Sequence, residues 1–494
     1  MTGLPALTIL VALPLLFGVA TLLLPKGADR AVKVLGIVGT SAVFVWTVLI
    51  MGAYSTSGHG MQFVELHEWV PVVGMSYHLG IDGLSLPLVF LAALLTVLCA
   101  IYSWRLKEQV KTFFFLLFLL QVGMIGVFIA LDGIMFYVFW EIVLVPMFFM
   151  IGIWGGERRR YASVKFFIYT LIGSVVMLLG LMLLYMWGPR TFDLIEIARW
   201  GQAGKFGMQQ QLWIYGCLFL GFAVKVPIFP FHTWLPDAHV EAPTVGSVLL
   251  AGVLLKMGGY GFLRISLPAL PYAFKYFSFG LGLLGVIGIV YGAAVALTQK
   301  DLKKMVAYSS VSHMGFVVLG IASATTAGID GAVMQMFSHG IITGMLFFLV
   351  GMIYERYHTK EIAQLKGIVT TIPVLGVIVA FASFASLGLP GLAGFVGEFM
   401  TLFGGYQAFG WMAAFAVVGI VLTAAYFLRM LQQCVFSPVT EDSAVCEQPC
   451  QLRTTEFLPL VPLMSFALFL GLYPQPFLAI INPAATALAA IIGR

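Results

Sequence analysis

The sequence predicts an all-α polytopic membrane protein with about fourteen transmembrane helices. Three observations support this fold class. Of the 494 residues, 61% are hydrophobic and only 10% are charged, whereas a soluble domain carries about 25% charged residues. The apolar residues gather in runs of about 20, the length at which a helix crosses a bilayer core of ~30 Å. The alternating pattern of a transmembrane β-barrel is absent.

The same composition excludes a soluble protein, a disordered chain and a nucleic-acid-binding protein. The net charge of +5 comes from 26 basic and 21 acidic residues, which are too few to form a continuous basic face. A water-facing surface needs more charge, and a disordered chain needs far fewer apolar residues. We therefore expect the chain to be surrounded by lipid and to bind no nucleic acid.

The apolar runs define the expected helices. The first run has no basic segment before it and no small-residue cleavage site after it, so we expect a retained membrane helix and not a signal peptide. The runs cover residues 4–24, 34–54, 82–104, 112–130, 133–154, 163–187, 212–231, 244–265, 276–298, 306–323, 330–353, 368–409 (interrupted), 411–433 and 457–480.

Lysine and arginine are distributed unevenly between the segments that connect these runs. With the N-terminus outside, the inner segments hold eighteen of the 26 basic residues and the outer segments hold six. The remaining two, Lys225 and Lys256, fall inside apolar runs. Because membrane proteins keep their basic loops inside, this split predicts fourteen crossings with both termini outside.

Helices four to eight and nine to thirteen form two sets of five, over residues 112–265 and 276–433. Because five is odd, the second set enters the membrane from the opposite side, as in transporters built from inverted repeats. We expect a three-helix segment, residues 1–111, before the two repeats. A loop and a last helix, residues 434–494, follow them.

The fourth helix of each set is broken by proline and glycine. The first break is Lys225-Val-Pro-Ile-Phe-Pro230 and the second is Leu387-Gly-Leu-Pro-Gly391. An ionisable residue lies beside each break: Lys225 in the first repeat and Glu398 in the second. Paired interrupted helices point to a transport site.

Four charged residues stand out because they lie inside apolar runs and away from their outer ends: Glu141, Lys225, Lys256 and Glu398. Each costs at least ~2.5–3.5 kcal/mol at the bilayer centre. They could form static ion pairs that hold helices together. They could also carry protons, because burial lowers the pKa of a lysine and a nearby carboxylate raises it again. We expect Glu141 and Lys225 to approach each other, and Glu398 to exchange protons with one aqueous side through its neighbouring break.

Two histidines extend this series of polar residues. His313 follows Ser309 and Ser310 by one turn on the same helix face, and His339 lies in the next apolar run. An imidazole titrates near neutral pH, which suits a proton relay. The alternative is a pair of core histidines whose hydrogen bonds are satisfied by serine.

No residue group predicts a metal or a cofactor in this chain. The loop with His232, Asp237, His239 and Glu241 has no helical ligand spacing, so we expect a packed or hydrated loop. Three thiols (Cys434, Cys446 and Cys450) are one fewer than a closed zinc or iron–sulfur site needs. Neither a phosphate-binding loop nor a dinucleotide fingerprint is present.

The same residues carry a family resemblance over essentially the whole chain. The sequence resembles the antiporter-like membrane subunits of NADH:quinone oxidoreductase, respiratory complex I, and within them the chain M type, the counterpart of mitochondrial chain 4. The motifs are Phe139-Trp-Glu-Ile-Val-Leu-Val-Pro-Met147, Ala223-Val-Lys-Val-Pro227, His232-Thr-Trp-Leu-Pro-Asp-Ala-His239, Glu241-Ala-Pro-Thr-Val-Gly-Ser247 and Ser310-Val-Ser-His-Met-Gly315.

The resemblance implies a proton-translocating subunit of a translocase. Its proton-transfer residues are implied at Glu141, Lys225, Lys256, His313, His339 and Glu398. It also implies an inner (cytoplasmic) membrane with the termini on the periplasmic side, and sibling antiporter-like subunits on both sides of the chain. FMN, iron–sulfur clusters and quinone are expected in partner subunits and no cofactor in this one.

Three other functions stay open from the sequence alone. The chain could belong to a cation/proton antiporter, although related antiporter chains usually carry lysine at the position of Glu398. It could be the homologous subunit of a ferredoxin- or hydrogenase-linked complex. It could also be a passive scaffold, in which the six polar residues would be replaceable.

Overall fold

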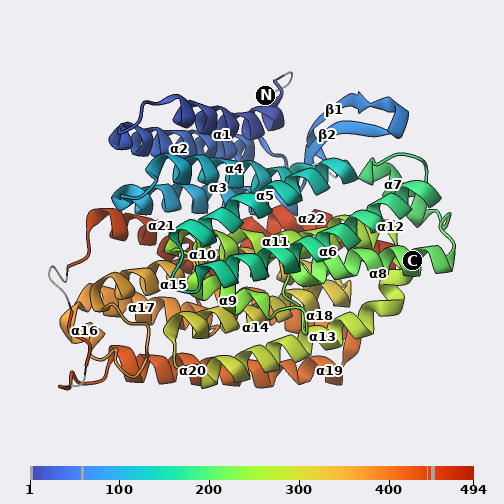
Figure 1. Cartoon of the computed structure of the whole chain (residues 1–494). Coiled ribbons are helices and arrows are strands. Elements are labelled where there is room, and N and C mark those ends of the chain that lie inside the picture. The colour runs from blue at the N-terminus through green and yellow to red at the C-terminus, as the bar shows by residue number, and fades with distance from the viewer. Residues whose placement is uncertain (1–3, 57–59, 442, 447–450, 494) are drawn as a thin grey trace.

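The computed structural model describes residues 4–56, 60–441, 443–446 and 451–493. They form a bundle of long helices that lie side by side (Figure 1). In this part of the chain, thirteen helices are long and apolar enough to cross a membrane. The predicted class, an all-α multi-pass membrane protein, is confirmed.

The uninterrupted long helices are α1 (Ala6–Leu23), α2 (Asp29–Ala53), α3 (Ser85–Tyr102), α4 (Val110–Ile129), α5 (Gly133–Trp154), α6 (Arg159–Trp187), α13 (Pro271–Thr298), α14 (Leu302–Ser323), α15 (Thr326–Tyr357), α21 (Thr454–Leu472) and α22 (Gln475–Ile492). Another span runs through α19 (Trp411–Ala414), α20 (Ala416–Met430) and the π-helical η5 (Leu431–Val435). Short elements are α7 (Leu194–Gln202), α16 (Ile368–Thr371) and the 3-10 turns η1 (Pro71–Val73) and η2 (Ser103–Arg105).

Two helices are discontinuous where the sequence predicts breaks. The first consists of α8 (Met208–Lys225) and α9 (Trp234–Glu241), and the second of α17 (Pro373–Ser386) and α18 (Ala393–Phe409). The span Thr244–Ala269 stays continuous but alternates between helix types. It runs through α10 (Thr244–Leu249), η3 (Leu250–Leu254), α11 (Leu255–Gly261), η4 (Phe262–Ser266) and α12 (Leu267–Ala269), and η3 and η4 are π-helical. The division into two inverted repeats, 112–265 and 276–433, stays a prediction.

The two ends of the bundle differ. One end carries the basic residues Arg158, Arg159 and Arg160 at the start of α6 and Lys300, Lys303 and Lys304 at the start of α14, and we call it the basic end. The opposite end carries α7 and an antiparallel hairpin of β1 (Gln62–Val70) and β2 (Met75–Ile81), and we call it the hairpin end (Figure 1). The sequence analysis missed this hairpin, because two irregularities in its register interrupt the alternation that marks a strand.

The predicted last run, 457–480, is two helices and not one. α21 ends at Leu472, and α22 begins after Tyr473-Pro474. Proline is favoured in the first turn of a helix but not inside it, so the chain turns there. α22 packs along α15, and its last turns line a cavity at the hairpin end together with Arg199 of α7.

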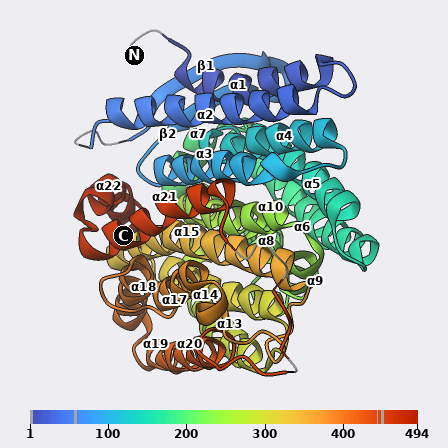
Figure 2. The same cartoon turned by 90° about the vertical axis from the view of Figure 1, so that its left-hand side faces the viewer.

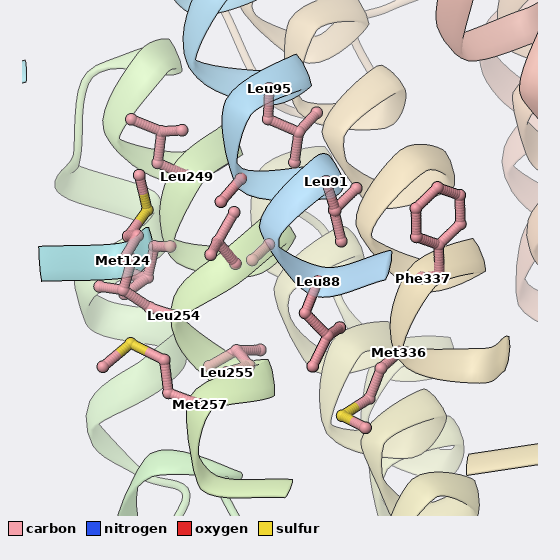
Figure 3. Packing of buried hydrophobic residues seen from close by; sticks show 14 of the residues in the cluster. Leu88, Leu91, Leu95, Met124, Leu249, Leu254, Leu255, Met257, Met336 and Phe337 are labelled. Atoms are coloured by element: carbon pink, nitrogen blue, oxygen red, sulfur yellow. The ribbon is translucent and has the colours of Figure 1, made fainter. Parts of the chain in front are cut away.

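Burial divides the helices into an inner and an outer group. The spans of α3, α10–α12, α14 and α15 are 89–100% buried, whereas those of α1, α2 and α21 are 33% buried. Figure 2 shows α1 and α2 as a layer beside the rest of the bundle. The inner helices interlock through leucine and methionine, with Leu88, Leu91 and Leu95 of α3 packed among side chains of α10, α11 and α15 (Figure 3).

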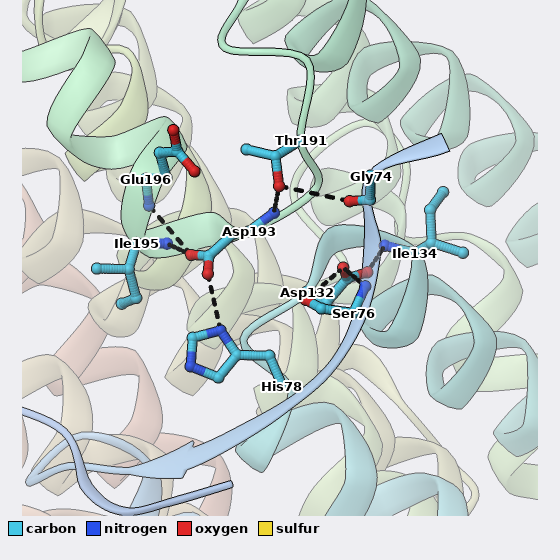
Figure 4. Close-up of polar contacts among 9 residues, drawn as sticks. All are labelled: Gly74, Ser76, His78, Asp132, Ile134, Thr191, Asp193, Ile195 and Glu196. Atoms are coloured by element: carbon cyan, nitrogen blue, oxygen red, sulfur yellow. Dashed lines mark hydrogen bonds and ion pairs between the residues drawn. The ribbon is translucent and has the colours of Figure 1, made fainter. Parts of the chain in front are cut away.

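Two carboxylates fasten the hairpin to the bundle (Figure 4). Asp193, which caps α7, lies 3.0 Å from Nδ1 of His78 on β2. Asp132, which caps α5, accepts hydrogen bonds from the amide and hydroxyl of Ser76. Burial by itself would raise the pKa of Asp193, but hydrogen bonds from His78 and from the amides of Glu196 and Ile195 outweigh it and lower that pKa.

Replacing this carboxylate should loosen the hairpin. Asp193→Asn should speed amide hydrogen exchange in β2, because the amide group interacts more weakly with His78. The lowered pKa means that the stabilisation is complete above the unfolded-state pKa of about 3.9 and is lost as the pH falls through the folded-state value. Glu68→Gln, at an exposed acid of the same hairpin, is the control. Equal exchange rates in both variants at neutral pH would contradict a role of Asp193 in holding the hairpin against the bundle.

Candidate functional site

Lys256 and His339 meet in the most deeply buried part of the bundle. The Lys256 side chain is 0% exposed, and its Nζ lies 2.7 Å from Nδ1 of His339 on α15. The same Nζ donates to the carbonyl of Ala251, one turn earlier. The ammonium therefore has partners from both packed helices.

Two glycines allow this contact. A Cβ atom on Gly340 would lie 2.8 Å from the carbonyl oxygen of Gly252 and 2.5 Å from a methyl carbon of Leu91. Real Cβ atoms do not approach backbone so closely, so only glycine lets the two helices come this near. The π-helical segments η3 and η4 flank α11, which carries Lys256, and such segments are frequent at functional sites.

His313 and Glu398 form a second contact in line with the first. Nδ1 of His313 lies 2.9 Å from Oε1 of Glu398, and its Nε2 lies 3.2 Å from the Ser386 hydroxyl. Both charged partners are 4–5% exposed. The serine that His313 contacts is Ser386 and not Ser309 or Ser310, whose hydroxyls donate to the carbonyl of Val306.

The two contacts are adjacent to each other. The ring centroids of His313 and His339 are 5.7 Å apart. A cavity of about 10 Å³ touches both rings, Gln335 and Glu398, which is about the volume that one water molecule requires. Lys256, His339, His313 and Glu398 therefore form a continuous polar line across four helices, α11, α15, α14 and α18.

Lys225 and Glu141 lie apart from this line and from each other. Lys225 is 2% exposed at the end of α8, with its Nζ 5.3 Å from the centroid of the Trp140 ring. Among the described residues no ion pair joins it to Glu141. The two charges nevertheless interact through space. The expected approach is thus electrostatic and not a direct contact.

Glu141 is the least enclosed of the six residues. Its side chain is partly exposed on α5, yet its Oε1 is buried without a hydrogen-bond partner in the described chain. On the other side of Lys225, α8 packs against α11, where a Cβ on Gly258 would lie 2.8 Å from the Phe222 carbonyl. Lys225 therefore lies between Glu141 and the helix that carries Lys256.

The polar line has the donors and acceptors for proton transfer. When Lys256 donates to Nδ1 of His339, a neutral imidazole carries its proton on Nε2, the atom that lacks a partner among the described residues. When His313 donates from Nδ1 to Glu398, its Nε2 accepts from Ser386. A proton that moves from one imidazole to the other reverses these roles.

The four residues considered for a metal have separate partners. The His239 ring stacks on Phe347, and the His232 ring packs against Phe229 and Tyr291. The remaining contacts are Asp237 with Lys165, at 2.6 Å, and Glu241 with the amide of Arg158, at 2.9 Å. Of the three thiols, Cys450 lies outside the described residues.

The sequence analysis missed several buried charges. Asp82 and Arg264 pair at 2.6 Å near the hairpin end, and Arg356 and Glu456 pair at 2.6 Å near the basic end. Arg264 and Arg356 were assigned to loops because they lie at the edges of apolar runs. Asp330, in the first turns of α15, is also buried. Asp82, Asp330 and Glu456 lie near the ends of predicted apolar runs, and acidic residues at such positions were the signal in the sequence that could have indicated these buried charges.

Comparison with known proteins shows the family of the chain. Residues 130–423 match the family described as "NADH:quinone oxidoreductase/Mrp antiporter, TM". Residues 33–127 match "NADH-ubiquinone oxidoreductase chain 4, amino terminus". The chain belongs to this family.

Individual relatives agree. The chain is 42% identical to NADH-quinone oxidoreductase subunit M of Rhodobacter capsulatus, over 97% of this chain and 95% of that protein. It is also 42% identical to subunit M of Rickettsia bellii, over 98% of both chains. A chain of respiratory complex I from Thermus thermophilus has the same fold, with a TM-score of 0.89 and 32% identity over 99% of this chain and 100% of that one. A chain of the Mrp complex from a Dietzia species shares the fold at 24% identity and a TM-score of 0.84, over 97% of this chain and 52% of that chain.

The glycine contact should be intolerant of even a methyl group. Gly340→Ala places a Cβ against the Gly252 backbone and should lower the unfolding temperature of the purified protein, since overpacking costs about 1–3 kcal/mol. Gly280→Ala on α13 is the control, because a Cβ there meets nothing within 4 Å. If G340A unfolds at the same temperature as G280A, the two helices are not held by close backbone contact.

Proposed function

We propose that this chain is the proton-translocating M-type membrane subunit of an NADH:quinone oxidoreductase. The observation that carries the proposal is the line of Lys256, His339, His313 and Glu398, buried inside a chain of this family. Electron transfer takes place in partner subunits, which hold the FMN, the iron–sulfur clusters and the quinone. This subunit contributes the path for protons.

The proposal includes the placement of the chain. It lies in an inner (cytoplasmic) membrane, with the basic end inside and the hairpin end and both termini on the periplasmic side. The distribution of basic residues between the two ends supports this orientation. Sibling antiporter-like subunits lie on both sides of the chain.

The six residues have different tasks. Glu141 is partly exposed on this chain, so a charge on a sibling subunit can draw it towards or away from Lys225. Losing the carboxylate's influence makes Lys225 release a proton, and regaining it makes Lys225 take one up. Lys256 and the two imidazoles hold the proton at Nζ, Nδ1 and Nε2 in turn, and Glu398 is the last station.

The energies are of the right order. Moving one proton against ~150 mV requires about 3.5 kcal/mol, at 2.3 kcal/mol per 100 mV. One unit of pKa change corresponds to about 1.4 kcal/mol, so a carboxylate that moves relative to a buried lysine can supply a substantial part of this energy.

A cation/proton antiporter is the alternative that the geometry disfavours. Glu398 is engaged by a ring nitrogen of His313 and lies beside the Ser386 hydroxyl that His313 also contacts. A carboxylate that is hydrogen-bonded to an imidazole nitrogen suits proton exchange, whereas a sodium ion is held by several oxygen ligands. Translocation that depends on sodium or potassium in vesicles would favour the antiporter.

Glu398 gives the first test of the path. In inside-out vesicles that contain the assembled complex, Glu398→Gln should reduce NADH-driven proton uptake by roughly tenfold or more, the usual contribution of a proton-transferring group. Glu398→Asp should keep partial activity, and Glu398→Lys should keep some, because siblings use lysine there. Near-normal uptake by E398Q would show that protons leave by another route.

Glu141 tests the coupling to the neighbouring subunit. Glu141→Gln should sharply reduce proton uptake while the complex still assembles, since the side chain makes no ion pair in the described chain that its loss would break. Glu157→Gln, at an exposed acid beyond the end of the same helix, is the control. Failure of E141Q to assemble, measured by native gel electrophoresis, would support a static role in holding helices together.

A further inference from the structure

We propose that Asp330 carries protons between Glu398 and the hairpin end, and that Asn482 of α22 positions its carboxylate. This inference rests on the proposed function and names a further residue of the same path. It replaces the break at Pro390-Gly391, expected from the sequence, as the outer route.

Asp330 is a buried acid with an incomplete set of partners. It is 3% exposed in α15, inside the bundle. Its Oδ2 accepts a hydrogen bond of 2.7 Å from the side-chain amide of Asn482, whereas its Oδ1 is buried with no partner among the described residues. Leaving a buried carboxylate oxygen unpaired is costly. A proton or a water molecule on Oδ1 removes that cost, as expected of a group that carries protons.

Backbone contacts place Asp330 close to Glu398. α15 and α18 are antiparallel, and a Cβ on Gly331 would lie 2.6 Å from the amide nitrogen of Thr401. Further along, a Cβ on Gly397 would lie 2.7 Å from the Cα of Gln335. In this register Glu398 lies level with residue 334, four residues from Asp330. At 1.5 Å per residue, Asp330 is about 6 Å nearer to the hairpin end.

Gln335 marks the side of Glu398 that faces away from Asp330, because its Cα is level with Gly397. It lies on α15 just over one turn from Asp330, and it lines the water-sized cavity that Glu398 and His313 share. Its Oε1 is buried without a partner in the described chain. A water molecule held by Gln335 in this cavity can therefore pass a proton from His313 to Glu398, and Asp330 lies on the other side of Glu398, towards the hairpin end.

Asn482 connects Asp330 to the surface. It is exposed in this chain, and the rest of α22 beyond it lines the cavity at the hairpin end. The route from Glu398 through Asp330 thus reaches the hairpin end where α15 packs against α22. The alternative is that Asp330 and Asn482 only hold α22 against α15.

The test measures NADH-driven proton uptake and electron transfer in vesicles that contain the whole complex. Asp330→Asn keeps the size and the hydrogen bond to Asn482 but cannot carry a proton, so uptake should fall by roughly tenfold or more. Asp330→Glu should restore most of the uptake. Glu196→Gln, at an exposed acid on α7, removes the same charge from the same end and should have no effect.

Asn482→Ala separates the positioning role. It should reduce uptake less than D330N, and the double variant should be no worse than D330N alone, because Asn482 acts only through the carboxylate. If D330N does not assemble, D330E against D330Q makes the same comparison with equal side-chain sizes.

The outcomes distinguish this inference from the function on which it rests. Normal uptake by D330N together with loss in E398Q overturns the role of Asp330 and favours the break at Pro390-Gly391. Normal uptake by both variants overturns the proposed function itself. Loss of uptake in D330E equal to that in D330N shows that only the shape of Asp330 matters, and the residue is then a clamp for α22.

Discussion

The contact between Lys256 and His339 is the constraint on which the arrangement of the inner helices depends. A lysine that is 0% exposed inside a membrane bundle needs partners at close range. Its carbonyl partner is on its own helix, but its imidazole partner is on α15, so these two helices must touch. Gly252 and Gly340 permit that approach. The leucines of α3 pack over this contact, which explains why the span of α3 is almost as buried as the spans that carry Lys256 and His339.

The two halves of the polar path differ in how complete they are. In the second half every member contacts another: Lys256 with His339, and His313 with Glu398. In the first half the Nζ of Lys225 lies over the face of Trp140 and forms no ion pair within the described chain, where Glu141 keeps an unpaired oxygen. One end of the path is therefore a series of side chains in contact, and the other end is a carboxylate with an unpaired oxygen in the described chain. Such a carboxylate responds to a neighbour, which is what coupling between subunits requires.

The sequence singles out six polar residues because an ionisable side chain inside an apolar run is conspicuous, and their role in proton transfer stays a prediction. It could not identify their partners, since pairing depends on which helices pack together. Glu141 and Lys225, which we expected to approach each other, form no ion pair among the described residues, while the Glu398–His313 contact was not foreseen. Arg264 and Asp82 were missed because charges at the edge of a run look like loop residues. The hairpin and α22 were missed for local reasons: irregular strand register, and a proline pair that divides one apolar run.

The two broken helices explain why one half carries a base and the other an acid. Lys225 is the last residue of α8, where the unpaired carbonyls of a helix end favour a cation. Glu398 lies in the second turn of α18, and its side chain points back over the start of that helix, where free amides favour an anion. A Cβ on Gly388 would lie 2.7 Å from Oε2 of Glu398, and this residue has a φ of +78°, so glycine alone fits beneath the carboxylate. The first break follows Lys225, so free carbonyls at a helix end stabilise a positive charge there. The second break precedes Glu398, so free amides at a helix start stabilise a negative charge.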